Sequence, residues 1–128
     1  MPGPEGFQYA LLRVVPRVER GERLNVGVVL FCRRHAFLGT RIELDEARLR
    51  ALDPSSDPAT LRPALEALAA VAAGDPAGGP LAELDRSERF GWLTAPSSTV
   101  IQPSAVHTGL TDDPAAELDR LFAKLVGP

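Results

Sequence analysis

The amino-acid sequence predicts an α+β fold, in which an antiparallel β-sheet packs against about three to four helices. The sheet should consist of an N-terminal three-stranded meander and one later strand. Two observations lead to this prediction. The stretch 7–31 is rich in valine and leucine at both odd and even positions, as in strands buried on both faces. Later residues carry apolar side chains at helical spacing, and strands followed by helices are typical of α+β domains.

The three strands of the meander are expected at 8–15, 25–32 and 37–44. The first two are apolar on both faces, whereas the third alternates apolar and charged residues and should have one face in water. The connection 16–24 is charged and contains Gly21, which can adopt the positive φ of a chain reversal. Short connections of this kind join antiparallel neighbours, so the three strands form a meander.

Two helices are expected after the meander. The first spans 46–52 with Asp45 as its N-cap, and the second ends at about Ala73, before Gly74.

The start of this second helix has two candidates. Asp57 followed by Pro58 is a favourable cap and first residue, but it places Pro63 in the second turn, where a proline costs a hydrogen bond. Thr60 as the cap avoids that conflict, so we expect the helix to begin there.

The next segment, 80–86, is expected to form one or two helical turns. Phe90, Trp92 and Leu93 then supply an apolar anchor in an irregular stretch. We place Trp92 in the core with its two apolar neighbours, rather than on the surface as a platform for stacking bases.

The last part of the chain is expected to contain a short strand, 98–102, and a loop, 105–110, that holds His107. A final helix follows, with Asp113 as its cap and Pro114 as its first residue. Its apolar residues have the i, i+3, i+4, i+7 spacing of an amphipathic helix: Leu118, Leu121, Phe122 and Leu125.

The length of 128 residues predicts a single domain, residues 1–128, with a flexible tail at 1–6. No apolar run is long enough to span a membrane, and MPGPEGF lacks the pattern of a signal peptide. Cys32 is the single cysteine, so no internal disulfide is expected, and a reducing, cytoplasmic setting follows. Two histidines without matched spacing do not predict a metal site, and we expect no cofactor.

The charge is unevenly distributed. The net charge of −3 argues against a general nucleic-acid binder. Residues 10–41, however, hold seven arginines against two glutamates, which leaves the remainder of the chain strongly acidic. These arginines either border the sheet in solvent or form a patch for phosphate or an acidic partner.

His107 is the most plausible reactive side chain, because a loop histidine can act as an acid or a base near neutral pH. The alternative is that His107 holds the loop by hydrogen-bonding the backbone. Cys32 shares its strand face with valines and a leucine, so we expect it to be buried rather than paired with His107.

Arg13 interrupts an apolar strand and needs a partner if it is buried. That partner is either an internal carboxylate such as Glu43 or an external phosphate or acidic surface. Asn25 can close the preceding turn, and Gly27 can permit a bulge or a close backbone approach. The candidate binding residues are Arg13, Arg17, Asn25, Arg33, Arg34, Arg89, Gln102, Ser104 and His107.

Three stretches carry a family resemblance: YALLRVVPRVERGERLNVGVVLF near the start, RFGWLTAPSSTVIQPS, and the AVHTG that follows it. Together they resemble a bacterial family catalogued as domain of unknown function 3037, from about Gln8 to Val126. The family brings no established activity, cofactor or catalytic residue. Its members are similar to small proteins encoded beside HipA-like kinase proteins, which implies a role as a partner.

Three functions remain open on the sequence. The leading hypothesis is a non-enzymatic interaction module that docks on another protein, such as a HipA-like kinase protein. The alternative is a phosphate- or nucleic-acid-directed enzyme or binder that uses the arginines and His107. The third is a homodimer, in which a second copy covers a surface that the helices leave open.

Overall fold

A computed structural model describes residues 4–97 and 99–127 of the chain. The strands within them are β1 (Glu5–Val14), β2 (Leu24–Cys32), β3 (Phe37–Ile42), β4 (Ile101–Pro103) and β5 (His107–Thr111). The helices are α1 (Glu46–Leu52), α2 (Pro58–Ala73), the 3₁₀ helix η1 (Pro76–Glu83), α3 (Arg86–Leu93) and α4 (Pro114–Leu125). Among these described residues, no helix has both the length and the apolar character needed to cross a membrane.

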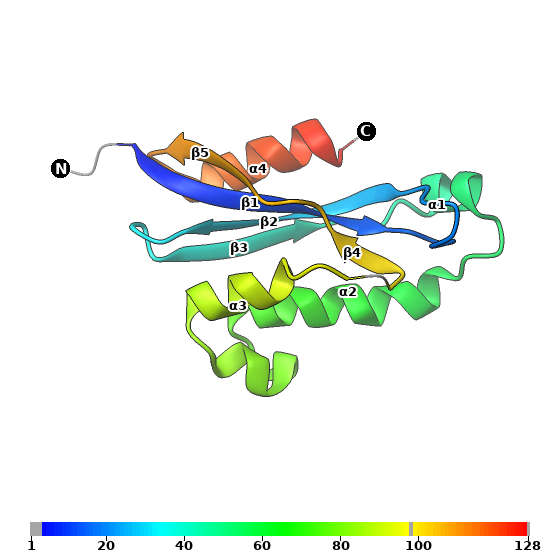
Figure 1. The fold of residues 1–128 in the computed structure, drawn as a ribbon, viewed down its shortest axis with the longest axis horizontal. Helices are drawn as coiled ribbons and strands as arrows, with labels where there is room; N and C mark the ends of the chain where they lie inside the picture. The colour runs from blue at the N-terminus through cyan, green and yellow to red at the C-terminus, as the bar shows by residue number, and fades with distance from the viewer. Residues whose placement is uncertain (1–3, 98, 128) are drawn as a thin grey trace.

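The strands form one five-stranded antiparallel sheet in the order β3-β2-β1-β4, and β5 also pairs with β1. The predicted α+β fold and N-terminal meander are therefore confirmed (Figure 1). β4 and β5 lie one after the other along the same edge of β1, because Leu12–Val14 pair with β4 and Glu5–Tyr9 pair with β5. The N-terminal strand is thus an inner strand.

A bulge interrupts the ladder between β1 and β2. Leu12 pairs with Gly27 and Arg13 pairs with Asn25, so one residue of β2, Val26, is extra. A Cβ atom on Gly27 would lie 2.9 Å from Ile42 Cγ1 on β3. It would also lie 3.0 Å from the backbone carbonyl oxygen of Arg41, so Gly27 permits the close backbone approach expected of it.

The sheet is covered on both faces, as the apolar composition of β1 and β2 requires. α4 packs on one face, and α2 and α3 pack on the other (Figure 1). The α4 side buries residues that include Phe7, Leu11, Val28, Leu30 and Cys32 of the sheet and Leu118, Leu121, Phe122 and Val126 of the C-terminal segment. The opposite side buries Ala10, Leu12, Val14, Val29 and Phe31 with residues of α1, α2 and α3 such as Leu49, Leu61, Leu65 and Phe90.

The prediction for the start of α2 was wrong. Asp57, and not Thr60, is the N-cap, because its side chain accepts a hydrogen bond from Ala59 N, with Pro58 as the first helical residue. Pro63 lies inside the helix. The proline forfeits one backbone hydrogen bond, and the favourable start at Asp57-Pro58 outweighs that cost.

The stretch expected to be irregular around Phe90 is helical. α3 begins after Asp85, whose side chain accepts a hydrogen bond from Glu88 N. Only part of its apolar anchor is buried: Phe90 and Leu93 lie in the core, whereas Trp92 is 47% exposed. The core placement of Trp92 was therefore also wrong, because the helix directs it away from its two neighbours.

The loop expected at 105–110 is largely strand β5. Its sequence, HTGLT, has no run of large apolar residues, and the strand depends on pairing with residues 5–9 of β1. Gly109 lies opposite Phe7, whose ring would be 2.6 Å from a Cβ atom on the glycine. Residues 5 and 6, which we expected in a flexible tail, belong to this pairing, while residues 1–3 lie outside the described part.

The C-terminal elements otherwise follow the prediction. Asp113 caps α4 by accepting from Ala116 N, and Pro114 is the first helical residue. The strand expected at 98–102 occurs as the shorter β4, which starts three residues later and includes Pro103, and residue 98 lies outside the described residues.

Candidate functional site

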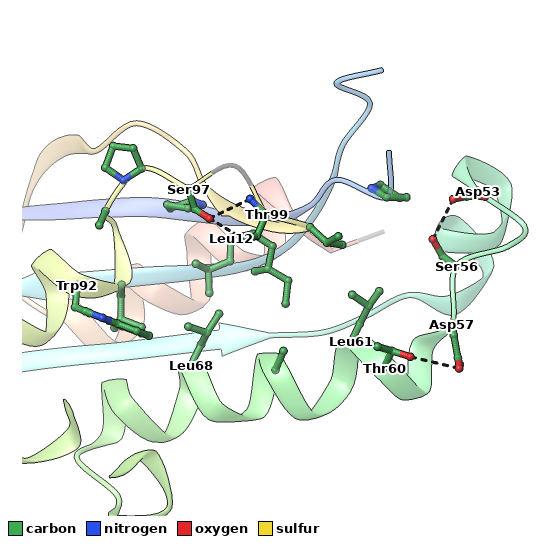
Figure 2. A pocket seen from close by; sticks show the side chains of 18 of the residues that line it. Leu12, Asp53, Ser56, Asp57, Thr60, Leu61, Leu68, Trp92, Ser97 and Thr99 are labelled. Carbon is green, nitrogen blue, oxygen red and sulfur yellow. Dashed lines mark hydrogen bonds between the residues drawn. The ribbon is translucent and has the colours of Figure 1, made fainter. Parts of the chain in front are cut away.

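A groove of about 910 Å³ lies between the sheet and α2. Its walls are α2 on one side and, on the other, β4 with the segment that joins α3 to β4. The volume lies in the range of pockets that bind small molecules or side chains of a partner. Figure 2 shows side chains along the groove, from one end to the other: Trp92, Leu68, Leu12, Leu61, Thr60, Asp57 and Asp53.

The middle of the groove is apolar. Leu12 of β1, Leu61 and Leu68 of α2, and Ile101 of β4 contribute to its lining. Leu12 is almost fully buried and Leu61 is buried, so both belong to the core and to the groove at once. The half-exposed Trp92 adds an aromatic surface at one end, where a ring or an aliphatic chain can pack against it.

The other end of the groove is polar and is organised by Asp53. Ser55 donates to Asp53 Oδ1 from its backbone N (3.0 Å) and from its hydroxyl (2.8 Å), and the Ser56 hydroxyl donates to Oδ2. The Nε atom of Arg17 lies 3.7 Å from Asp53 Oδ2. The hydrogen bonds from Ser55, followed by the charge of Arg17, hold the pKa of Asp53 below its usual value.

Asp57 is the second carboxylate at this end, and it is exposed. It is held by Ala59 N and the Thr60 hydroxyl at the start of α2. Because the carboxylate already occupies the helix N-terminus, that terminus does not offer its free N–H groups to an anion. Asp53 and Asp57 are the ionisable side chains among the described residues that line the groove.

Arg89 positions the helices that build this side of the molecule. Its Nη1 atom donates to Val71 O (3.1 Å) and Ala72 O (2.9 Å), two carbonyls at the C-terminal end of α2. The guanidinium is buried, and the negative end of the α2 dipole favours its charge. Gly74 ends α2 with a φ of 71°, and a Cβ atom there would lie 3.0 Å from Arg89 Nη1. Arg89 therefore fastens α3 to α2.

The predicted residues Gln102, Ser104 and His107 lie along the β4–β5 edge. The Ser104 hydroxyl accepts from Leu11 N (2.8 Å), which bridges the gap between the two short strands. Gln102 donates to Thr99 O, and His107 is exposed beside the ring of Tyr9, with 5.3 Å between the ring centroids. Ser104 thus contacts the backbone of β1, and Gln102 contacts the backbone of its own loop.

Arg13 and Asn25 are neighbours on the α4 side of the sheet. Arg13 Nε donates to Asn25 Oδ1 (3.2 Å), and Asn25 donates to Leu125 O at the end of α4 (3.1 Å). The observed partner of Arg13 is therefore Asn25 rather than Glu43. Burial, followed by the charge of Arg23, lowers the pKa of Arg13. Asn25 joins the sheet to α4 instead of closing a turn with its own backbone.

The remaining predicted arginines lie at opposite ends of the sheet. Arg17 is in the connection between β1 and β2, beside Asp53. Arg33 and Arg34 are in the turn between β2 and β3. Arg33 Nη2 donates to the Ser87 hydroxyl, and Arg34 Nε lies 3.9 Å from Glu5 Oε2. Nine residues of β2 separate the two ends, or roughly 27 Å. The structure does not bring the predicted binding residues into one site, and none of them lines the groove.

Cys32 is fully buried on the α4 side, and its thiol lies 3.5 Å from Gly6 O, as expected for a core cysteine. Within residues 4–97 and 99–127, no group of three or more histidine, cysteine, aspartate or glutamate side chains is placed to hold a metal ion.

The groove could not be predicted from the sequence. Its lining comes from β1, α2, α3, β4 and the loops between them, and the space depends on how these elements are spaced in three dimensions. One local signal was available: Asp85 with Glu88 three residues later is a capping pattern that could have identified α3 and so the exposed position of Trp92.

A family model matches residues 9–126, nearly the whole chain. The chain belongs to the family described as protein of unknown function (DUF3037). A search of curated proteins gave no match, and neither did a search of solved structures. Because this family is described as having no known function, the function of this member has to be argued from its own groove and surfaces.

Proposed function

We propose that this protein is a non-enzymatic interaction module whose groove receives an apolar segment of a partner protein. The observation that supports this most directly is the lining: a leucine-rich middle, an exposed tryptophan at one end and two carboxylates at the other. Such a surface offers apolar area and one aromatic anchor, the features that dominate binding at protein interfaces.

The chemistry of the lining favours binding over reaction. Among the described residues of the groove there is no histidine, cysteine, lysine or arginine. Asp53 is held by Ser55 and Ser56, and Asp57 is used as the cap of α2, so neither is free to move a proton.

The charges of the groove indicate which segment it takes. The exposed carboxylate of Asp57 attracts a positive side chain and repels a negative one. The matching occupant is a short segment whose leucine, isoleucine or phenylalanine side chains fill the middle, with a lysine or arginine at the polar end.

The partner that we propose is a HipA-like kinase protein, acting with this protein in the cytoplasm. This choice follows from the family resemblance, which implies a role beside HipA-like kinase proteins, whereas the groove supplies the surface on which such a partner would dock. The phosphate- or nucleic-acid-directed alternative stays a prediction. A thermal-shift titration with nucleotides and oligonucleotides at two salt concentrations tests it, because phosphate binding weakens as salt rises.

Isothermal titration calorimetry between this protein and a HipA-like kinase protein from the same organism tests the proposal. Ala64 is exposed and lines the groove, whereas Ala67 is exposed on the same helix and does not line it. We expect A64F to weaken binding at least about tenfold, or roughly 1.4 kcal/mol, and A67F to leave it unchanged. Trp92 is the single tryptophan, so its fluorescence should shift to the blue when the groove fills.

Two results would contradict different parts of the proposal. Equal weakening by A64F and A67F would show that the partner binds elsewhere. If the kinase protein does not bind, but a peptide containing leucine and lysine shifts the Trp92 fluorescence, then the groove is a binding site and the proposed partner is wrong.

A further inference from the structure

β5 is an edge strand without a neighbour on its outer side among the described residues. Its inner side pairs with residues 5–9 of β1, and no other described strand pairs with it. Every second residue of an edge strand directs its N–H and C=O groups outward, where they can pair with another chain.

The features that protect other edges are missing from this one. β4 ends at Pro103, which has no N–H to donate, and β3 carries the charged Arg41. The stretch 104–111, SAVHTGLT, contains no proline and no acidic or basic residue other than His107. Leu110 on this edge is 72% exposed, and Val106 is 39% exposed. This combination of an uncharged strand and exposed apolar side chains is typical of a pairing surface.

The side chains of this edge complement a second copy of themselves. When Thr108 lies opposite Thr108 of the other copy in an antiparallel pair, Leu110 of each copy lies opposite Val106 of the other. Leu110 shares a face of β5 with Thr108, and Val106, the residue just before β5, has the same parity and falls on that face when the pairing extends the strand by one residue. On the opposite face, His107 of each copy lies opposite Gly109 of the other, so the larger ring meets a residue without a side chain.

Charge also favours this arrangement over a parallel one. Asp112 and Asp113 follow directly after β5, whereas Ser104 and Ala105 precede it. Antiparallel pairing places the two aspartates of one copy next to the uncharged end of the other. A parallel pair would place all four carboxylates together.

We propose that two copies of this protein associate through β5, in the antiparallel register that places Thr108 opposite itself, to form one continuous sheet. A two-fold axis generates such an interface from one surface patch. The contact is a single strand edge, at the small end of the range for protein interfaces, so the dimer should depend on concentration. The groove between β4 and α2 is a separate surface, and this inference does not rest on it.

Sedimentation velocity over a wide concentration range tests the association. We expect a shift from the 13.7 kDa chain to a particle of twice that mass as the concentration rises. T108K places two ammonium groups opposite each other and should move the midpoint to at least tenfold higher concentration, as a rough minimum. V18K changes a residue that is 44% exposed in the connection between β1 and β2, at a distance from β5, and should leave the midpoint unchanged.

Cysteine cross-linking tests the register. The native Cys32 is the single cysteine and is fully buried, so any disulfide between two copies must form through the introduced cysteine. Opposed Cα atoms in antiparallel strands are about 4.5–5.5 Å apart, within the span of a disulfide, so T108C should form a covalent dimer on oxidation. In the same register, Leu110 and its counterpart are about 13 Å apart, so L110C should not cross-link.

Each contrary result overturns the proposal. A wild-type chain that remains monomeric throughout the concentration range excludes the dimer. A dimer that T108K leaves unchanged uses another surface, and cross-linking of L110C in place of T108C excludes the register.

Discussion

The two faces of the sheet are covered in different ways. One amphipathic helix, α4, packs over Phe7, Leu11, Val28 and Leu30. The other face is covered by α1, α2 and α3, and the groove lies where α2 and β4 do not meet. The comparison shows that one continuous apolar stripe closes a face, whereas a cover assembled from several helices leaves space between its parts.

Each face also has a polar side chain that holds the C-terminal end of its helix. On the groove side, Arg89 donates to carbonyls of Val71 and Ala72 at the end of α2. On the α4 side, Asn25 donates to Leu125 O, and Arg48 donates to Val126 O. The last carbonyls of a helix lack partners within it, so these side chains satisfy groups that would otherwise be unpaired. The predictions below compare the two sides, from the largest expected effect to the smallest.

The largest loss of stability should come from removing a buried side chain on the face that α4 covers. Leu30 is fully buried against α4, so L30A should lower the free energy of unfolding by about 2–5 kcal/mol. Leu68 is partly buried and already borders the groove, so L68A removes fewer contacts and should cost less. Urea denaturation followed by circular dichroism measures both. A loss for L68A as large as that for L30A would contradict the difference between the faces.

The next effect should come from Arg89. R89M keeps much of the apolar volume but leaves the carbonyls of Val71 and Ala72 without their donor, which should cost about 1.5–3 kcal/mol. R62M is the control, because Arg62 lies on the same region of the fold with an exposed ion pair to Glu46, and such pairs contribute about 0–1 kcal/mol. Similar losses for the two variants, measured by urea denaturation, would show that Arg89 does not fasten α2.

A smaller effect is expected from Asn25 on the α4 side. N25A removes hydrogen bonds to Arg13 and Leu125 O, and the Arg48 contact to the end of α4 remains, so the loss should be about 0.5–1.5 kcal/mol. Q102A removes a partly buried side chain whose hydrogen bond is to its own loop, so its stability should stay within about 0.5 kcal/mol of wild type. If N25A lowered the free energy of unfolding by more than R89M does, the expected order of the two polar contacts would be wrong.

The smallest effect concerns pH at the polar end of the groove. The pKa of Asp53 is lower in the folded protein than its usual value, because Ser55 and then Arg17 favour the ionised form. Ionised Asp53 therefore stabilises the fold above its unfolded-state pKa of about 3.9, and this contribution is lost as pH falls through the folded-state pKa. D53N should be less stable than wild type near neutral pH, and the difference should shrink in acid. Urea denaturation at several pH values measures this, and a difference independent of pH would contradict the assignment.

Local sequence was sufficient for the elements whose stabilising residues are close in the chain. The apolar residues of β1 and β2 at both parities predicted two buried strands. Asp113 and Pro114, followed by a helical stripe, predicted α4 together with its cap. Buried Cys32 and the close approach at Gly27 were also expected, because both follow from residue type within a strand.

The errors occurred where distant residues decide the local structure. β5 has little strand character of its own and forms because residues 5–9 of β1 present an open edge to it. Trp92 was assigned to the core by residue type, yet the turn of α3 directs it to the rim of the groove. Arg89 was predicted as a binding residue, yet it is buried and donates to two carbonyls that lie 17 and 18 residues earlier in the chain.

The sequence by itself determined the α+β composition, the meander and the residues buried at its centre, because alternation and helical spacing are properties of neighbouring residues. Tertiary structure alone decided that β4 and β5 share the edge of β1, that α2 and β4 enclose a groove, and that the predicted arginines lie apart. These features depend on distances between segments far apart in the chain, and side-chain periodicity holds no information about such distances.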